Sequence, residues 1–224
     1  MSEVEFAVTR RAHRLKGRPE ELGMSDAEAT YLEKLYNKDD IVFEWGSGWS
    51  TVYFKDLVKS YYSAEHDNKW CNLVFSELMG ATKQTVEMFF KPPHDIKFDK
   101  QFDDVAHILL KEWSTESVSR PPPEFEVESY EEDGIWYYKG RSGLDWHCFI
   151  DYLNTIEEAN EERFDKVVVD GRVRPFCAFK AIEYMDENST LIVHDFTTRL
   201  WNHSILEWFD LTDTAGTFGV FKKK

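Results

Sequence analysis

The chain has 224 residues, of which 42% are hydrophobic and 31% charged, and its formal net charge is −15 at pH 7. This length and composition predict one globular domain and exclude a disordered chain. Phosphate backbones repel so acidic a surface, which argues against nucleic-acid binding. No apolar stretch could span a membrane or form a signal peptide, and the three cysteines lack metal-type spacing, so we expect no membrane contact and a cytoplasmic location.

Residues 1–39 form a predicted helical lead-in, in which Ser25 and Glu28 can make a capping box at the start of a helix. A short apolar run at 41–45 predicts a buried strand, which Gly46 and Gly48 end before a helix opened by Ser50 or Thr51. The next predicted elements are a strand at 61–65, a helix at 68–79 and a strand at 85–90.

A polar insertion over residues 91–145 interrupts this alternation after the third strand. It contains a triple proline at 121–123 and an acid-rich stretch at 124–133. Its composition allows a helix at 105–113 and a hairpin at 126–139.

Regular alternation then resumes to the end of the chain. We predict helices at 146–156 and 175–185, and strands at 166–170 and 190–194. Two further strand-like runs, 206–211 and 217–222, are separated by five residues only. So short a link cannot make a parallel crossover, so these strands should form an antiparallel hairpin. The sequence therefore predicts a single α/β domain over 1–224, a Rossmann-like three-layer sandwich with a mostly parallel seven-stranded sheet.

A glycine turn follows the first strand, in Glu44-Trp45-Gly46-Ser47-Gly48. Two glycines there allow a sharp turn and a close approach to a ligand. Thr51 stands where a dinucleotide-binding fingerprint has its third glycine. This disfavours binding of a pyrophosphate but is compatible with binding of an amino-acid carboxylate or a sulfonium. The alternative is a plain tight turn between strand and helix.

Acidic residues also end three other predicted strands. Glu65 closes the second strand, where a carboxylate can accept both hydroxyls of a ribose, although it could also be an exposed charge. Asp170 and Asp195 end two later strands, and His194 precedes Asp195. Such a group could hold a divalent metal or serve as a base with its orienting partner; alternatively, the aspartates only cap the following helices.

In this order, these features resemble the class I S-adenosylmethionine-dependent methyltransferases, from about residue 25 to the C-terminus apart from the insertion. The resemblance implies that the turn holds the methionine part of S-adenosylmethionine and that Glu65 holds its ribose. The implied cofactor-binding residues are Glu44, Gly46, Ser47, Gly48, Ser50, Thr51, Glu65, His66 and Asp170.

A narrower resemblance concerns VVVDGR at 167–172 and LIVHDF at 191–196. They are similar to the corresponding strands of metal-dependent sugar and catechol O-methyltransferases. That branch implies Mg²⁺ or Mn²⁺ on Asp170, His194 and Asp195, although an imidazole in place of an acidic ligand favours softer metals. The lysine base of the catechol enzymes has no counterpart, so without a metal His194 is the candidate base.

The implied reaction is O-methylation of a small-molecule or carbohydrate hydroxyl by a chain that could form a homodimer. The insertion should contribute to the acceptor pocket, unless its aromatic residues only pack it onto the sheet. Arg172 and Arg174 could fix an anionic or hydroxyl-rich substrate. The candidate substrate residues are Tyr138, Trp146, His147, Arg172 and Arg174.

Three other functions remain open at this point. A nicotinamide-dependent oxidoreductase is disfavoured by the missing third glycine and by the final hairpin. An aminopropyltransferase and a non-catalytic binding module could both use the same fold.

Overall fold

A computed structural model of the chain describes residues 22–79, 86–92, 128–132, 135–139 and 149–224. Its main sheet has seven strands in the order β3-β2-β1-β6-β7-β9-β8. The five strands β3, β2, β1, β6 and β7 are parallel, whereas β9 is antiparallel to both β7 and β8. The strands are β1 (Ile41–Trp45), β2 (Ser60–Glu65), β3 (Val86–Phe90), β6 (Lys166–Val169), β7 (Thr190–Val193), β8 (Phe209–Ala215) and β9 (Phe218–Lys223).

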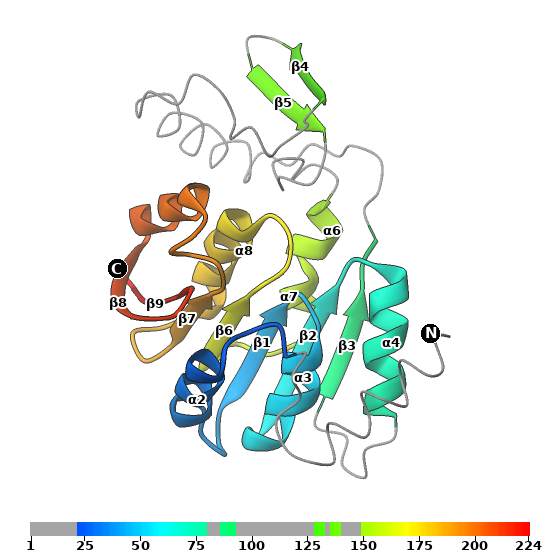
Figure 1. Ribbon diagram of the computed structural model, residues 1–224, viewed down its shortest axis with the longest axis vertical. Coiled ribbons are helices and arrows are strands. Elements are labelled where there is room, and N and C mark those ends of the chain that lie inside the picture. The colour runs from blue at the N-terminus through cyan, green and yellow to red at the C-terminus, as the bar shows by residue number, and fades with distance from the viewer. Residues whose placement is uncertain (1–21, 80–85, 93–127, 133–134, 140–148) are drawn as a thin grey trace.

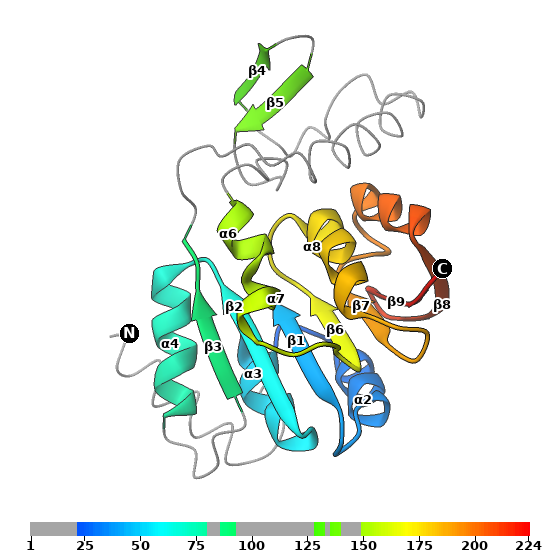
Figure 2. The same cartoon turned by 180° about the vertical axis from the view of Figure 1, so that it is seen from behind.

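Helices cover both faces of this sheet (Figure 1, and from behind Figure 2). One layer contains α2 (Asp26–Leu35), α3 (Trp49–Phe54) and α4 (Asn68–Leu78); the other contains α6 (Ile150–Leu153), α7 (Thr155–Glu158) and α8 (Arg174–Ala181). Because side chains alternate along a strand, Val168 packs in the α2–α4 layer, and its neighbours Val167 and Val169 pack against α6–α8. The structure therefore confirms the predicted three-layer, Rossmann-like sandwich.

The strand register brings the predicted site residues to one edge of the sheet. Trp45 of β1 pairs with Ala64 of β2 and with Val169 of β6, which in turn pairs with Val193 of β7. The residues that follow these four positions therefore all emerge at the carboxyl end of the sheet. The chain leaves β1 toward β2 and later returns to its other side at β6, so β1 lies at the topological switch point where such folds bind ligands.

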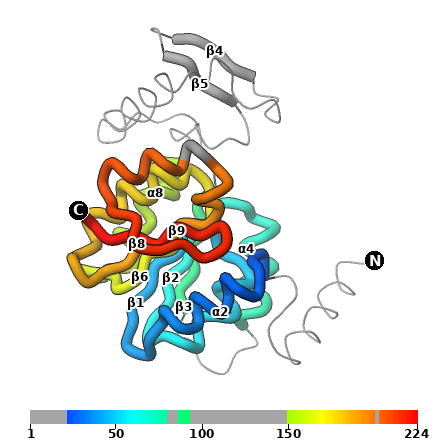
Figure 3. Tube along the Cα trace, turned by 60° about the vertical axis from the view of Figure 1, so that its left-hand side comes forward, coloured from blue at the N-terminus to red at the C-terminus, as the bar shows by residue number. Residues whose placement is uncertain are grey.

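The capping box at Ser25 is confirmed, and it has a second use. The Glu28 backbone N–H donates to Ser25 Oγ at 3.3 Å, while Glu28 Oε2 accepts the Ser25 backbone N–H at 2.6 Å. Glu28 Oε1 also accepts the backbone N–H and the hydroxyl of Thr217, at 2.6 and 2.8 Å. The first turn of α2 is thereby tied to the turn of the C-terminal hairpin. Figure 3 shows the course of both segments along the Cα trace.

The hairpin forms as predicted, but its first strand lies further along the chain. The prediction of a strand at 206–211 is wrong in its bounds, because the 3-10 helix η4 (Leu200–Glu207) occupies the start of that range and β8 begins only at Phe209. Strand β8 instead continues through the residues expected to form the link, and Gly216 and Thr217 alone make the turn. Residues 210–214 are exposed on an edge strand. Their composition therefore lacks the apolar alternation that would reveal a strand.

Other elements differ in smaller ways. Two short helices, α6 and α7, replace the single helix predicted at 146–156, and α8 ends in the 3-10 helix η3 (Ile182–Tyr184). Within the insertion, β4 (Glu128–Glu132) and β5 (Ile135–Lys139) form the predicted antiparallel hairpin. The helix expected at 105–113 lies outside the described residues. No helix in the described part of the chain is long and apolar enough to cross a membrane.

Candidate functional site

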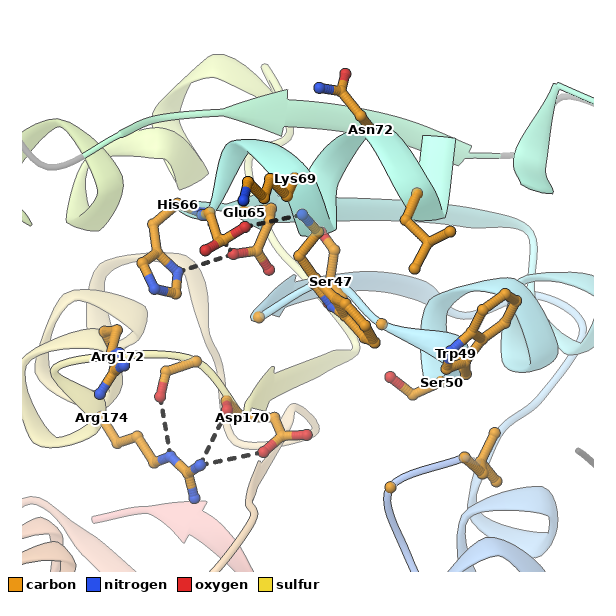
Figure 4. Close-up of a pocket in the computed structure, with 18 of the residues that line it drawn as sticks. Ser47, Trp49, Ser50, Glu65, His66, Lys69, Asn72, Asp170, Arg172 and Arg174 are labelled. Atoms are coloured by element: carbon orange, nitrogen blue, oxygen red, sulfur yellow. Dashed lines mark hydrogen bonds and ion pairs between the residues drawn. The ribbon is translucent and has the colours of Figure 1, made fainter. Parts of the chain in front are cut away.

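A cavity of about 1100 Å³ opens at the carboxyl edge of the sheet (Figure 4). Predicted site residues from three strand ends line it: the turn after β1, Glu65 and His66 at the end of β2, and Asp170, Arg172 and Arg174 after β6. The residues that the sequence analysis did not single out are Leu22, Gly23, Trp49, Asp67, Lys69, Trp70, Asn72, Leu73, Gly171 and Arg199. Most of these lie on α4 or on the lead-in, where no motif marked them.

Gly46 forms the floor of this cavity by direct backbone contact with Gly171. Its φ angle is +103°, and a Cβ atom added there would lie 2.5 Å from the Gly171 backbone nitrogen. A Cβ on Gly171 would in turn lie 2.0 Å from the Tyr152 hydroxyl oxygen. Gly46 therefore requires glycine, whereas a side chain at Gly171 would have to displace the Tyr152 hydroxyl. The contact holds the β1 turn against the loop after β6.

Gly48 differs, because an added Cβ would make only ordinary contacts, the nearest with Ser50 Oγ at 3.5 Å. It caps α3, which begins at Trp49 and not at the predicted Ser50 or Thr51. The Gly48 backbone N–H donates to Thr51 Oγ1 at 2.9 Å.

Glu44 lies beneath the turn, fully buried, and does not line the cavity. Its carboxylate accepts hydrogen bonds from Ser50, Thr51 and Ser63, at 2.9, 2.5 and 2.7 Å. Burial raises the pKa of Glu44 to about 7, and the three hydroxyl donors only partly offset it. Glu44 thus fixes the start of α3 to β1 and β2, and a direct contact between Glu44 and a cofactor stays a prediction.

Glu65 faces the cavity although its residue is only 2% exposed. Its Oε1 atom accepts the backbone N–H groups of His66 and Asp67, both at 2.8 Å, and lies 2.9 Å from His66 Nδ1. These contacts fix the carboxylate in one orientation. An ionised carboxylate has about four acceptor sites, so it can still accept hydroxyl groups from a ligand.

On the Glu65 side of the cavity, Trp70 connects helix α4 with the glycine turn after β1. Its Nε1 atom donates to the Ser47 carbonyl at 2.6 Å, which joins α4 to the glycine turn. Asp67 caps α4 by accepting the Trp70 backbone N–H at 2.8 Å. Asp is one of the residues typical of a helix N-cap, so this signal could have revealed Asp67. Nothing local in the sequence reveals a contact between a tryptophan and a turn 23 residues away.

At the other half, Arg174 lies between the two aspartates predicted to act together. Its guanidinium donates to Asp170 Oδ1 at 3.2 Å and to Asp195 Oδ2 at 3.0 Å. It also donates to the backbone carbonyls of Gly171, Asp170 and His194. Arg199 donates to the same Asp195 oxygen at 2.9 Å. Figure 4 shows Arg174 reaching toward Asp170 on the side of the cavity across from Glu65.

This arrangement does not fit the predicted Mg²⁺ or Mn²⁺ site. The Arg174 side chain is only 8% exposed and is ion-paired with both carboxylates, so a divalent cation would have to displace a buried guanidinium. The described residues contain no group of three His, Cys, Asp or Glu side chains placed to hold a metal ion. Asp170, His194 and Asp195 do come together as predicted, but around an arginine.

His194 belongs to this cluster but does not line the cavity. Its Nδ1 atom lies 2.6 Å from Asp170 Oδ1, and its ring lies 4.7 Å from that of Phe218. Burial lowers the pKa of His194, whereas the hydrogen bond to Asp170 and the negative charges of Asp170 and Asp195 raise it. The raising effects together are larger, so the pKa lies above its ordinary value. The raised pKa favours the imidazolium more than in a free histidine, and Asp170, unlike His194, faces the cavity. A role of His194 as the base stays a prediction.

The predicted substrate residues are only partly described. Arg172 and Arg174 line the cavity as expected. Trp146 and His147 lie outside the described residues, and of Tyr138 only the backbone, in β5, is described. Arg199 was missed, although it follows the predicted end of β7 closely enough to be suspected.

Comparisons with known proteins agree with the fold. A methyltransferase-like protein from Silicibacter pomeroyi has a TM-score of 0.59 and 21% identity, over 90% of this chain and 87% of that one. A putative methyltransferase from Streptococcus mutans, in complex with SAH, has a TM-score of 0.49 and 10% identity, over 90% and 99% of the two chains. No protein-family model and no curated protein matches the sequence. At such identities the likeness to the first structure establishes the fold alone.

Proposed function

We propose that this chain is an S-adenosylmethionine-dependent methyltransferase that acts on a hydroxyl group of a small molecule. The observation that carries the proposal is the buried carboxylate of Glu65, which faces the cavity one strand away from the Gly46 turn. A carboxylate that backbone N–H groups already orient suits the paired hydroxyls of a ribose. The fold shared with a methyltransferase-like protein supports this proposal.

The cavity residues divide between the parts of such a cofactor. Glu65 would hold the ribose, with His66 beside it. The backbone of Gly46, Ser47 and Gly48 would lie along the methionine part, because no side chain obstructs the approach at Gly46. S-adenosylmethionine, when bound, supplies an electrophilic methyl group on a sulfonium.

Asp170 would orient the acceptor and take its proton. Its carboxylate lines the cavity, and Arg174 and His194 hold it in place. The acceptor oxygen gains positive charge as its bond to the methyl carbon forms, which makes its proton more acidic, so a carboxylate is a sufficient base. Much of the rate would then come from holding the hydroxyl in line with the methyl group.

Binding of S-adenosylhomocysteine to the wild-type chain and to Glu65→Gln, measured by calorimetry, tests the proposal. We expect micromolar binding by the wild type and at least about tenfold weaker binding by the variant, equivalent to about 1.4 kcal/mol. Glutamine keeps an oxygen for the His66 and Asp67 N–H groups but loses the charge and one acceptor oxygen.

Glu158→Gln is the matched control, because Glu158 is 47% exposed and pairs with Lys91 on the surface. It should bind as the wild type does, and all variants should unfold at similar temperatures. Wild-type protein that shows no binding, or equal binding by Glu65→Gln, would refute the proposed function.

A further inference from the structure

Glu44 is a buried carboxylate without a cationic partner. It is 0% exposed, and its oxygens accept hydrogen bonds from the hydroxyl groups of Ser50, Thr51 and Ser63. No lysine, arginine or histidine among the described residues forms an ion pair with it. Because burial disfavours the charged form of a carboxyl group, Glu44 takes up a proton at a higher pH than an exposed glutamate does.

The groups that face Glu44 from the surrounding elements add no positive charge. Three buried tyrosines lie close enough for its charge to act on their hydroxyl groups: Tyr36 at the end of α2, Tyr61 in β2 and Tyr152 in α6. Burial raises the pKa of Glu44 to about 7 against its hydroxyl donors, and the negative charge of Asp170 adds to this increase. Asp170 lines the cavity, so a charge placed in the cavity also acts on Glu44.

A chain of hydroxyl groups joins Glu44 to the cavity wall. Ser63 Oγ donates to Glu44 Oε2 at 2.7 Å and lies 2.7 Å from Ser47 Oγ. Ser47 lines the cavity. While Glu44 is ionised, Ser63 donates to it and therefore accepts the hydroxyl proton of Ser47. Once Glu44 is protonated, it can donate to Ser63, and both serine hydroxyls can rotate to the opposite direction.

The two protonation states of Glu44 suit different ligands. The ionised state places a negative charge beneath the glycine turn and leaves the oxygen of Ser47 free to accept. The protonated state removes this charge and leaves the proton of Ser47 free to donate. A cation in the cavity stabilises the ionised state, so by linkage the ionised state binds a cation more tightly. An uncharged ligand at the same place has no such preference.

We infer that Glu44 is a proton-linked switch that makes the cavity prefer a cationic ligand when its carboxyl group is ionised. The inference rests on the proposed function and adds a regulation of the same site. S-adenosylmethionine carries a positively charged sulfonium, whereas its product S-adenosylhomocysteine carries an uncharged sulfur. Ionised Glu44 therefore favours the cofactor over the product, and acidification increases inhibition by the product.

Calorimetric titration of both ligands, between about pH 6 and about pH 8, tests the inference. A bound cation lowers the pKa of Glu44, so binding of S-adenosylmethionine releases a proton at low pH and becomes tighter as the pH rises through about 7. We expect the ratio of the two dissociation constants to shift about fivefold toward S-adenosylmethionine over this range. In Glu44→Gln it should change by less than about 1.5-fold.

Glu28→Gln is the matched control. Glu28 is also buried, but its pKa is lowered to about 2, so it does not titrate in this range and its variant should keep the wild-type pH dependence. Ser63→Ala removes one hydroxyl donor that lowers the pKa of Glu44, so it should move the transition to higher pH. Infrared spectra of the wild type should show a protonated carboxyl band that titrates near neutral pH and is missing in Glu44→Gln.

Each outcome separates this inference from the proposed function. If both ligands bind but their ratio does not depend on pH in the wild type, the inference is overturned and the proposed function stands. The same holds if Glu44→Gln keeps the full pH dependence, which would assign the titration to His66 or His194. If Glu44→Gln does not fold, the infrared titration and the shift in Ser63→Ala decide. If neither ligand binds, the proposed function fails and the inference fails with it.

Discussion

Among single residues, Gly46 and Glu44 shape the cavity floor in two different ways. Gly46 provides a close backbone contact with Gly171, and Glu44 gathers three hydroxyl groups beneath it. Glu44 and Glu28 are both buried, yet their pKa values shift in opposite directions. Glu28 accepts two backbone N–H groups as well as hydroxyls, and this outweighs its desolvation, whereas hydroxyls alone do not compensate the deeper burial of Glu44.

Gly46→Ala should destabilise the chain and close the cavity. The new Cβ would lie within 3 Å of the backbone of Asp170 and Gly171, at a φ angle that alanine rarely adopts. We expect a loss of about 2–4 kcal/mol in the free energy of unfolding, measured by denaturant titration, and at least tenfold weaker binding of S-adenosylhomocysteine.

Gly48→Ala is its control, since its Cβ would make only ordinary contacts, with Ser50 and Trp70. It should cost about 1 kcal/mol or less, chiefly through a poorer helix cap. Equal losses in the two variants would contradict the importance of the Gly46–Gly171 contact.

Between elements, the contact of α2 with the C-terminal hairpin is the clearest long-range link. Glu28 lies in the first turn of α2, and its carboxylate accepts two hydrogen bonds from Thr217, which is 189 residues away in the sequence. The hairpin places an antiparallel edge on the sheet, and this contact holds the turn of that edge in position.

Glu28→Gln should weaken this link and alter the acid stability of the chain. We expect a loss of about 1–3 kcal/mol at pH 7, because the charge-assisted hydrogen bonds are lost. The pKa of Glu28 is lowered from 4.5 to about 2, so its contribution is complete above pH 4.5 and is lost as the pH falls from 4.5 toward 2. Thermal unfolding of wild type and variant should therefore converge in acid.

Glu33→Gln provides a control on the same helix, where the partly exposed carboxylate of Glu33 accepts a hydrogen bond from the Tyr53 hydroxyl of α3 at 2.7 Å, whereas Glu28 is joined to the C-terminal hairpin. Its effect should be smaller and should not share the acid dependence of Glu28→Gln. A constant difference between wild type and Glu28→Gln from pH 7 down to pH 2 would argue against the lowered pKa.

For the whole molecule, the dominant electrostatic fact is the net charge of −15. Mutual repulsion of surface carboxylates destabilises a compact state, and salt screens it. We expect the midpoint of thermal unfolding at pH 8 to rise by several degrees when sodium chloride increases from about 10 to about 300 mM, which shortens the Debye length from roughly 30 to below 8 Å.

Near pH 4.9, the isoelectric point calculated from the sequence, the same salt increase should have little effect. A similar rise at both pH values would point to general salt effects on apolar burial. A fall in the midpoint at pH 8 would show that stabilising ion pairs, such as those around Arg174, outweigh the repulsion.

The sequence by itself determined the succession of strands along the chain, apart from the bounds of β8, and the antiparallel direction of the last hairpin. Apolar runs such as 166–169 mark buried strands, and the short link before the last strand excludes a parallel connection. The same reasoning placed Gly46, Glu65 and Asp170 at one edge, because the carboxyl ends of parallel strands meet there. These features depend on local pattern and on simple rules of chain connection.

Only the tertiary structure decided what those residues do together. It placed Arg174 between Asp170 and Asp195, where the sequence suggested a metal, and it brought Trp70 to the Ser47 carbonyl. It also showed that exposed residues of β8 complete the sheet. Such contacts join residues far apart in the chain and depend on loop paths and side-chain reach, which leave no periodic signal in the sequence.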